Sequence, residues 1–399
     1  MTKLEVKDVQ VDDNLDDDFV EAIVPPPTPA IENRTVAVVK QLRPWHKPRK
    51  QLVRRSWSHH IRSLMRSLHI PADSSRIFRY LTLAGPDMLD IRHLEDVTVK
   101  AGFKLKYVGF SPRGSKDEAE IILAQNQMRS YDWIDRNSDT LWYRLEDIAA
   151  GEKSTAMRAV ESHGPYHAIN FDLCQNITQT KAGAPSILDA LIKLISFQSA
   201  GGTGSWLLFI TTKIEPLNTP DSRVADFLKA INSNIKDSEQ FSAEFSQLCQ
   251  QEGISYEDAL NEPKKLSTDA FVKFFCLGFT KWLIGHLCTA YPVIELSMQG
   301  SHIYSVEQGS KDMLSLVYKC SPILRKPADP NPVRSTREVE IDSGLTAVRK
   351  TLLLCDIDNK MATEPQLLED LTLETHALLR SANYAQDIIS LAVETAVPA

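Results

Sequence analysis

The chain has 399 residues, of which 43% are hydrophobic and 24% are charged, and its formal net charge is −7. These values are ordinary for a globular protein and predict a sizeable hydrophobic core. No segment holds 18 uninterrupted apolar residues, and the six cysteines form no CxxC pair or Cys/His cluster, so we expect no membrane span, no metal site and no disulfide framework.

The first 71 residues divide into two segments of opposite charge. Residues 1–35 are acidic and then rich in proline, a composition that predicts a disordered tail. They show no basic-then-apolar leader pattern, so we expect a cytoplasmic location. Residues 36–71 are basic, with nine Lys or Arg and no acid between positions 40 and 66.

The basic segment predicts an amphipathic helical arm that ends before Pro71. At about 100° per residue its apolar side chains share one face: Trp57, Ile61, Leu64, Met65 and Leu68. Arg55, Arg62 and Arg66 fall on the opposite face. Because a row of cations can neutralise backbone phosphates, residues 40–66 are a candidate contact for nucleic acid or phosphate. The alternative is a solvated basic face, or one screened by the acidic tail.

Residues 72–321 predict an α/β domain in which strands and helices alternate. Five segments have strand character: 76–85, 103–110, 140–145, 166–173 and 205–212. The helical patterns between them imply a doubly wound, mostly parallel sheet. Residues 213–266 then interrupt the alternation and predict a helical insertion.

The end of this domain predicts two further strands, at 293–300 and 313–321. Only a polar, hairpin-like link separates them, so we expect antiparallel neighbours and a seven-stranded Rossmann-like sheet with an antiparallel terminal hairpin. Residues 322–336 are rich in proline and predict a linker. Residues 337–399 predict a helical C-terminal appendage.

This order of elements resembles the class I S-adenosylmethionine (SAM)-dependent methyltransferase family, whose Rossmann-like sheet has seven strands and an antiparallel last strand. The resemblance covers about residues 76–321 and rests on the order of elements more than on motifs. It implies a SAM cofactor held by the loops that follow the parallel strands.

In that family the loop after strand one wraps the methionine end of the cofactor. Gly85 matches a family glycine, and the resemblance makes Pro86 and Asp87 its neighbours in the cofactor site. The alternative for Pro86 and Asp87 is helix initiation and capping. After strand two the family has an acid that binds the ribose hydroxyls, whereas this chain has Phe110 and Ser111. Either the cofactor is held differently, or the site no longer binds it.

Two further loops supply the remaining candidate site residues. Glu146 and Asp147 match the position of a family acid near the adenine amino group. Asp172 ends strand four, where the resemblance implies a catalytic group beside the methyl group, and Asn170 lies deeper on the strand with the same parity. Ligands of open α/β sheets bind at this carboxyl edge. The alternative for Asp172 is capping or solvent exposure.

The leading hypothesis is a SAM-dependent methyltransferase-like protein whose catalysis is retained, weakened or lost and whose acceptor is unknown. The alternative is a non-catalytic Rossmann-like scaffold or binding protein, nucleic-acid-associated through the basic helix. The long tail and the departures in the cofactor loops favour that alternative.

Overall fold

The computed structural model describes residues 40–68, 76–151, 154–180, 183–202, 204–306, 311–323 and 334–392. The tail predicted at 1–35 and most of the linker predicted at 322–336 lie outside the described residues, as do residues 36–39 and 69–71 of the predicted arm.

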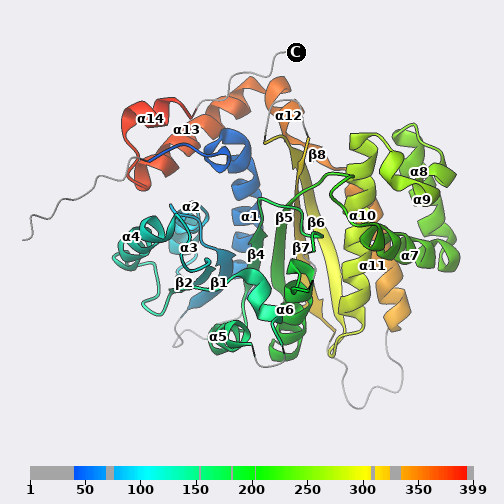
Figure 1. Ribbon diagram of the computed structural model, residues 1–399, viewed down its shortest axis with the longest axis horizontal. Helices are drawn as coiled ribbons and strands as arrows, with labels where there is room; N and C mark the ends of the chain where they lie inside the picture. The colour runs from blue at the N-terminus through cyan, green and yellow to red at the C-terminus, as the bar shows by residue number, and fades with distance from the viewer. Residues whose placement is uncertain are drawn as a thin grey trace, which may run out of the picture. The chain divides into compact units, whose positions relative to one another are not determined.

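The centre of the fold is an eight-stranded sheet of order β3-β2-β1-β4-β5-β7-β6-β8 (Figure 1). The strands are β1 (Ile77–Leu83), β2 (Lys104–Phe110), β3 (Asp139–Leu141), β4 (Ala168–Asp172), β5 (Trp206–Lys213), β6 (Ile294–Tyr304), β7 (Met313–Pro322) and β8 (Cys355–Asp356). Strands β1 to β5 pair in parallel, and β8 is parallel to β6. Strand β7 runs antiparallel to both β5 and β6. The predicted α/β class and the mostly parallel sheet are confirmed.

The prediction of seven strands was one strand short. The extra strand, β8, comes from the segment predicted as a helical C-terminal appendage, residues 337–399. Two residues are too few to show the alternation by which a strand is recognised in a sequence. This segment therefore contributes to the sheet as well as to the helices around it.

Helices occupy most of the chain between the strands and after them. They are α1 (Pro48–Ser67), α2 (Leu89–Arg92), α3 (Glu95–Lys100), α4 (Glu118–Arg129), α5 (Thr155–His163), α6 (Ile187–Gly201), α7 (Asp221–Asp237), α8 (Glu239–Gln251), α9 (Tyr256–Asn261), α10 (Thr268–Cys288), α11 (Thr336–Leu352), α12 (Ile357–Thr363), α13 (Pro365–Ser381) and α14 (Gln386–Ser390). Helices α7, α8 and α9 lie within the predicted insertion at 213–266.

The sheet is covered on both faces, and β5 shows how. Because successive side chains of a strand point to opposite faces, Leu208 and Ile210 join the core formed with α5, α6, α7, α10 and α11. Leu207 and Phe209 join the core on the other face, formed with α1, α3, α4 and α12. Burial on both faces explains why the sequence of β5 is almost wholly apolar.

Helix α10 is apolar around most of its circumference. By length and composition it could cross a membrane, but most of it is buried inside the protein, between α7, α11 and the sheet. It is the one helix in the described part of the chain that passes this test. A helix that is apolar all round is expected where other elements surround it.

The predicted basic arm is part of the sheet's covering layer. Helix α1 begins at Pro48, a residue suited to the first helical position because its missing N–H is not needed there. The Trp57 ring packs against Phe209 of β5, with ring centroids 5.9 Å apart. Figure 1 shows α1 running along the sheet beside β5. The predicted apolar face of α1 is thus the face that packs on the sheet.

We expect Trp57→Ala to lower the free energy of unfolding by about 3–5 kcal/mol, because Trp57 is only 2% exposed and its loss leaves a cavity under α1. Denaturant unfolding of the full chain measures this. The control is Arg66→Ala on the exposed face of the same helix, expected within about 0.5 kcal/mol of wild type. Equal small effects of both variants would show that α1 is not part of the core.

Candidate functional site

A cavity of about 770 Å³ opens at the carboxyl ends of β1, β2 and β4. Strand β1 connects to β2 on one side and lies beside β4 on the other, and open α/β sheets bind ligands where the strand order reverses in this way. The β1–α2 turn lines the cavity with residues 82–91, and the loop after β4 with residues 172–175. Helix α1 closes it with Lys50 and Arg54.

Most of the predicted site residues line this cavity. They are Gly85, Pro86, Asp87, Phe110, Ser111, Glu146 and Asp172. Asn170 does not: it is fully buried within the sheet and donates a hydrogen bond from Nδ2 to Tyr80 Oη at 2.8 Å. Asp147 does not line it either, because its carboxylate accepts the backbone N–H of Arg144 at 2.8 Å and caps a short 3₁₀ helix.

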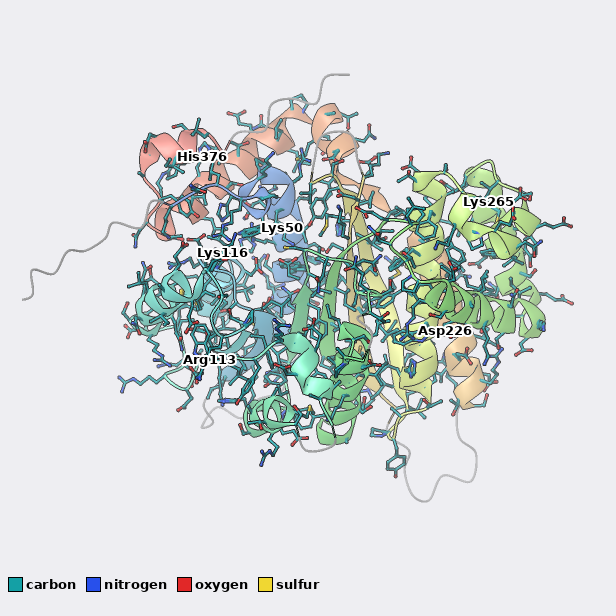
Figure 2. The ribbon with its side chains drawn as sticks, viewed as in Figure 1. Lys50, Arg113, Lys116, Asp226, Lys265 and His376 are labelled. Atoms are coloured by element: carbon teal, nitrogen blue, oxygen red, sulfur yellow. The ribbon has the colours of Figure 1, made fainter. Side chains whose placement is uncertain are left out.

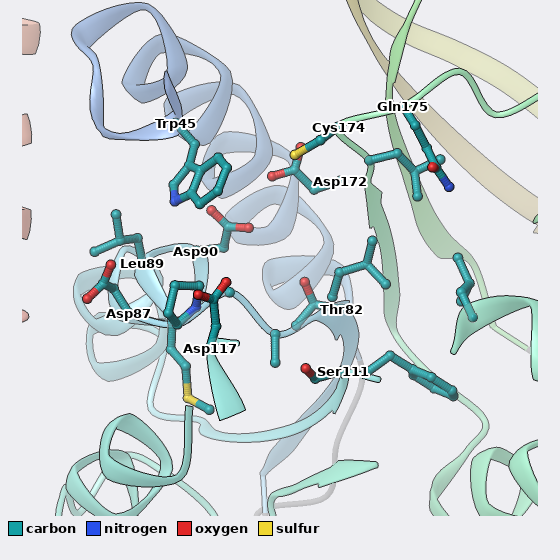
Figure 3. Close-up of a pocket in the computed structure, with 18 of the residues that line it drawn as sticks. Trp45, Thr82, Asp87, Leu89, Asp90, Ser111, Asp117, Asp172, Cys174 and Gln175 are labelled. Atoms are coloured by element: carbon teal, nitrogen blue, oxygen red, sulfur yellow. The ribbon is translucent and has the colours of Figure 1, made fainter. Parts of the chain in front are cut away.

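Asp87 is held by donors from both ends of the described chain. Lys40 Nζ lies 2.7 Å from Oδ1, Tyr384 Oη donates to Oδ2 at 2.8 Å, and His46 Nε2 lies 3.2 Å from Oδ2. Burial alone would raise the pKa of Asp87, but the contacts with His46 and Lys40 lower it well below its usual range. In Figure 3 the Asp87 carboxylate lies at the edge of the site, away from Asp172. Asp87 thus connects the N-terminal stretch that holds Lys40 and His46 to the C-terminal segment that holds Tyr384.

Two cations of α1 that the sequence did not single out form part of the cavity wall. Lys50 Nζ binds Oδ1 of Asp172, and Arg54 Nε donates to Oδ1 of Asp90 at 2.8 Å. Both side chains are buried, Lys50 at 3% and Arg54 at 2% exposure. Figure 3 shows the carboxylates of Asp90 and Asp172 directed toward the same space, with the Trp45 ring next to Asp90.

The position of Lys50 and Arg54 could have been found from helical periodicity. Stepping back from Trp57 by three residues and then by four reaches Arg54 and Lys50, which places both on the apolar face of α1. A cation on a buried helix face needs a carboxylate partner. The predicted apolar face of this helix ended at Trp57 on its N-terminal side. Extending the face toward the N-terminus would have identified Lys50 and Arg54.

The arginines on the opposite face of α1 lie away from the cavity. Arg55 Nε donates to Glu374 of α13 at 2.8 Å. Arg62 Nη2 lies 3.9 Å from Asp96 of α3, and Arg66 is exposed. Two of the three predicted phosphate contacts therefore already face carboxylates of the same chain.

Burial and neighbouring charges have opposing effects on the pKa of Asp172. Burial raises the pKa of the Asp172 carboxyl, and the neighbouring Asp90 adds to this, while Lys50 opposes it. Burial would lower the pKa of Lys50, but Asp172, Tyr304 and Asp90 together raise it above its ordinary value, so the ammonium stays charged. Burial also raises the pKa of Tyr304, which faces the pair, to about 12.

Two features of the cavity wall leave room and bonding capacity for a ligand. A Cβ added at Gly85 would meet no atom within 4 Å, so the backbone there borders open space. The Glu146 carboxylate makes no hydrogen bond or ion pair with the described residues, although it lines the cavity. Among the same residues, no group of three His, Cys, Asp or Glu side chains could hold a metal ion.

We expect Asp87→Asn to lower the free energy of unfolding at pH 7 by about 3–5 kcal/mol, since it leaves the buried His46 and Tyr384 and the half-buried Lys40 without their anion. The pKa of Asp87 is lowered in the folded protein, so this contribution is full above about pH 4 and declines as the pH falls toward the folded-state pKa. Unfolding of both proteins across this pH range measures it. Asp117→Asn, which breaks the more exposed pair with Arg43, serves as control and should cost about 1 kcal/mol.

None of the curated proteins compared matches the chain. A family model described as PP_RS20740-like matches residues 39–392. That match spans well over half of the chain and includes every described strand and helix, α1 among them. The chain therefore belongs to the PP_RS20740-like family.

Proposed function

We propose that the protein binds SAM in the cavity at the carboxyl edge of the sheet and acts as a SAM-dependent methyltransferase-like protein. The observation that carries the proposal is the position of the cavity: it lies between the ends of β1 and β4, and a glycine borders it after β1. The antiparallel insertion of β7 between β5 and β6 also supports it, because the resemblance implies a last strand of this kind.

Three residues fit parts of the cofactor. Gly85 allows a close approach to the backbone, because a side chain would otherwise fill the space beside it. Glu146, whose carboxylate has no partner among the described residues, can bind amino or hydroxyl groups of a ligand. Arg54 has one buried nitrogen, Nη1, without a hydrogen-bond partner among the described residues, which suits it to a carboxylate.

The position after β2 fits less well. Phe110 is buried and Ser111 can offer only a hydroxyl to a ribose. The nearest acid further along the chain that lines the cavity is Asp117, and its carboxylate is held by both terminal nitrogens of Arg43, at 2.7 and 2.6 Å. We therefore expect weaker cofactor binding than a free ribose-binding acid would give.

The bound cofactor would supply an electrophilic methyl group on a sulfonium. The chain's part in the reaction would be orientation of the acceptor, with Asp172 the carboxylate best placed at the end of β4. The α1 side chains Lys50 and Arg54 would limit the entry of water from that side.

A second candidate is a binding protein without catalysis. The contact that favours it is the bond from Lys50 to Asp172, which engages one oxygen of the proposed catalytic carboxylate. In that case the cavity would bind a ligand without transfer of a methyl group.

We expect isothermal titration of the full chain with SAM to detect binding, and Gly85→Leu to weaken it at least about tenfold, or about 1.4 kcal/mol. The leucine side chain would occupy the space beside Gly85, and its backbone conformation is not one that requires glycine.

The matched control is Gly285→Leu in α10, where an added Cβ also meets nothing within 4 Å but which does not line the cavity. It should bind SAM as the wild type does. Absence of heat with wild-type protein contradicts the proposal, and equal affinities of wild type and Gly85→Leu place the ligand elsewhere.

A further inference from the structure

The Lys50 side chain is buried and held by contacts with its neighbours. Its Nζ lies 4.7 Å from the centre of the Trp57 ring, a favourable position for a cation. The side chain is 3% exposed and meets Asp172 and Tyr304 at its charged end. In Figure 2 Lys50 lies in the middle of the molecule along α1, whereas Lys265 lies at the periphery. An ammonium held in this way has little freedom to move.

Asp172 is held on one side only. Its Oδ1 accepts the hydrogen bond from Lys50, and no described residue donates to Oδ2. The side chain is 18% exposed and lines the cavity, so it is more accessible than its partner. Figure 3 shows the carboxylate directed toward the space it shares with Trp45 and Asp90.

We infer that Lys50 is a positioning residue: it holds Oδ1 of Asp172 so that Oδ2 faces the cavity and accepts the hydrogen of the methyl acceptor's N–H or O–H. The inference rests on the proposed function for the nature of the reaction. It deepens that function by naming the acceptor class, an amine or hydroxyl that still carries hydrogen on its nucleophilic atom.

Methyl transfer needs only the acceptor, Asp172 and bound SAM. A lone pair of the acceptor nitrogen or oxygen forms the bond to the methyl carbon. Bound SAM would supply the methyl group by loss of its carbon–sulfur bond, with both electrons kept on a sulfur that becomes neutral. The acceptor's proton passes to Oδ2 of Asp172, which burial makes a better proton acceptor than an exposed carboxylate. A nucleophile without hydrogen would make no use of Oδ2.

The other groups around Asp172 do not replace Lys50 in this role. Arg54 is bound to Asp90, and Asp90 itself can only repel the carboxylate. Tyr304 and Cys174 are neutral at pH 7, since burial raises the pKa of both. Lys50 is thus the group that neutralises and orients Asp172.

The test is the titration of Asp172 in the full chain, followed by ¹³C NMR of carboxyl-labelled aspartate and assigned with Asp172→Asn. In Lys50→Met we expect the pKa of Asp172 to rise by about one pH unit or more, because the favourable charge is gone. Lys50→Arg should restore a value near that of the wild type. Lys47→Met, which removes an exposed lysine just before α1, should leave it unchanged.

Lys50→Met leaves Asp172 without its cation and can unfold the protein. Lys50→Gln keeps an N–H donor and should shift the titration in the same direction. An unchanged Asp172 titration in both variants overturns the inference, because Lys50 would then not hold the carboxylate. The titrations need no SAM, so failure of SAM binding in calorimetry overturns the proposed function separately.

Discussion

Neutralisation of carboxylates at the carboxyl edge of the sheet is the constraint on which the rest of the structure depends. Four cations of residues 40–54 each meet one carboxylate that lines the cavity. The pairs are Lys40–Asp87, Arg43–Asp117, Lys50–Asp172 and Arg54–Asp90. A buried carboxylate without a partner is strongly unfavourable. The carboxylates at the sheet edge therefore need the cations of residues 40–54, and these cations need the carboxylates.

Apolar packing and ion pairing specify the same position for α1. Trp57 fixes where the helix lies on β5, and helical geometry then places Arg54 and Lys50 one and two turns earlier on the same face. The C-terminal segment is tied to the same place, since Tyr384 donates to Asp87. Segments far apart in sequence thus meet at one turn, the turn between β1 and α2.

The sequence predicts the elements well where burial imposes a period, and poorly where contacts are tertiary. Strand β5 was predictable because its first five residues are all apolar, whereas β8 is too short to show alternation. Asp172 and Glu146 were predictable as cavity residues because they follow strands of a parallel sheet. Asn170 was grouped with Asp172 because the two side chains point to the same face of β4. Two residues further into the strand, however, the Asn170 side chain is buried and donates a hydrogen bond to Tyr80.

The pairing of charges also determines how the cavity can recognise a ligand. Within the described part of the chain, each lining carboxylate apart from Glu146 faces a cation, including Asp312, whose Oδ2 lies 3.6 Å from Lys213. A charged ligand therefore gains little from electrostatic attraction to the cavity wall. Breaking a buried ion pair to bind it would cost more free energy than the new contact provides. Three features remain to recognise a ligand by the direction of its groups: the Glu146 carboxylate, Oδ2 of Asp172, to which no described residue donates, and the open backbone at Gly85. A site built in this way selects its ligand by the placement of hydrogen-bonding groups, with net charge contributing little.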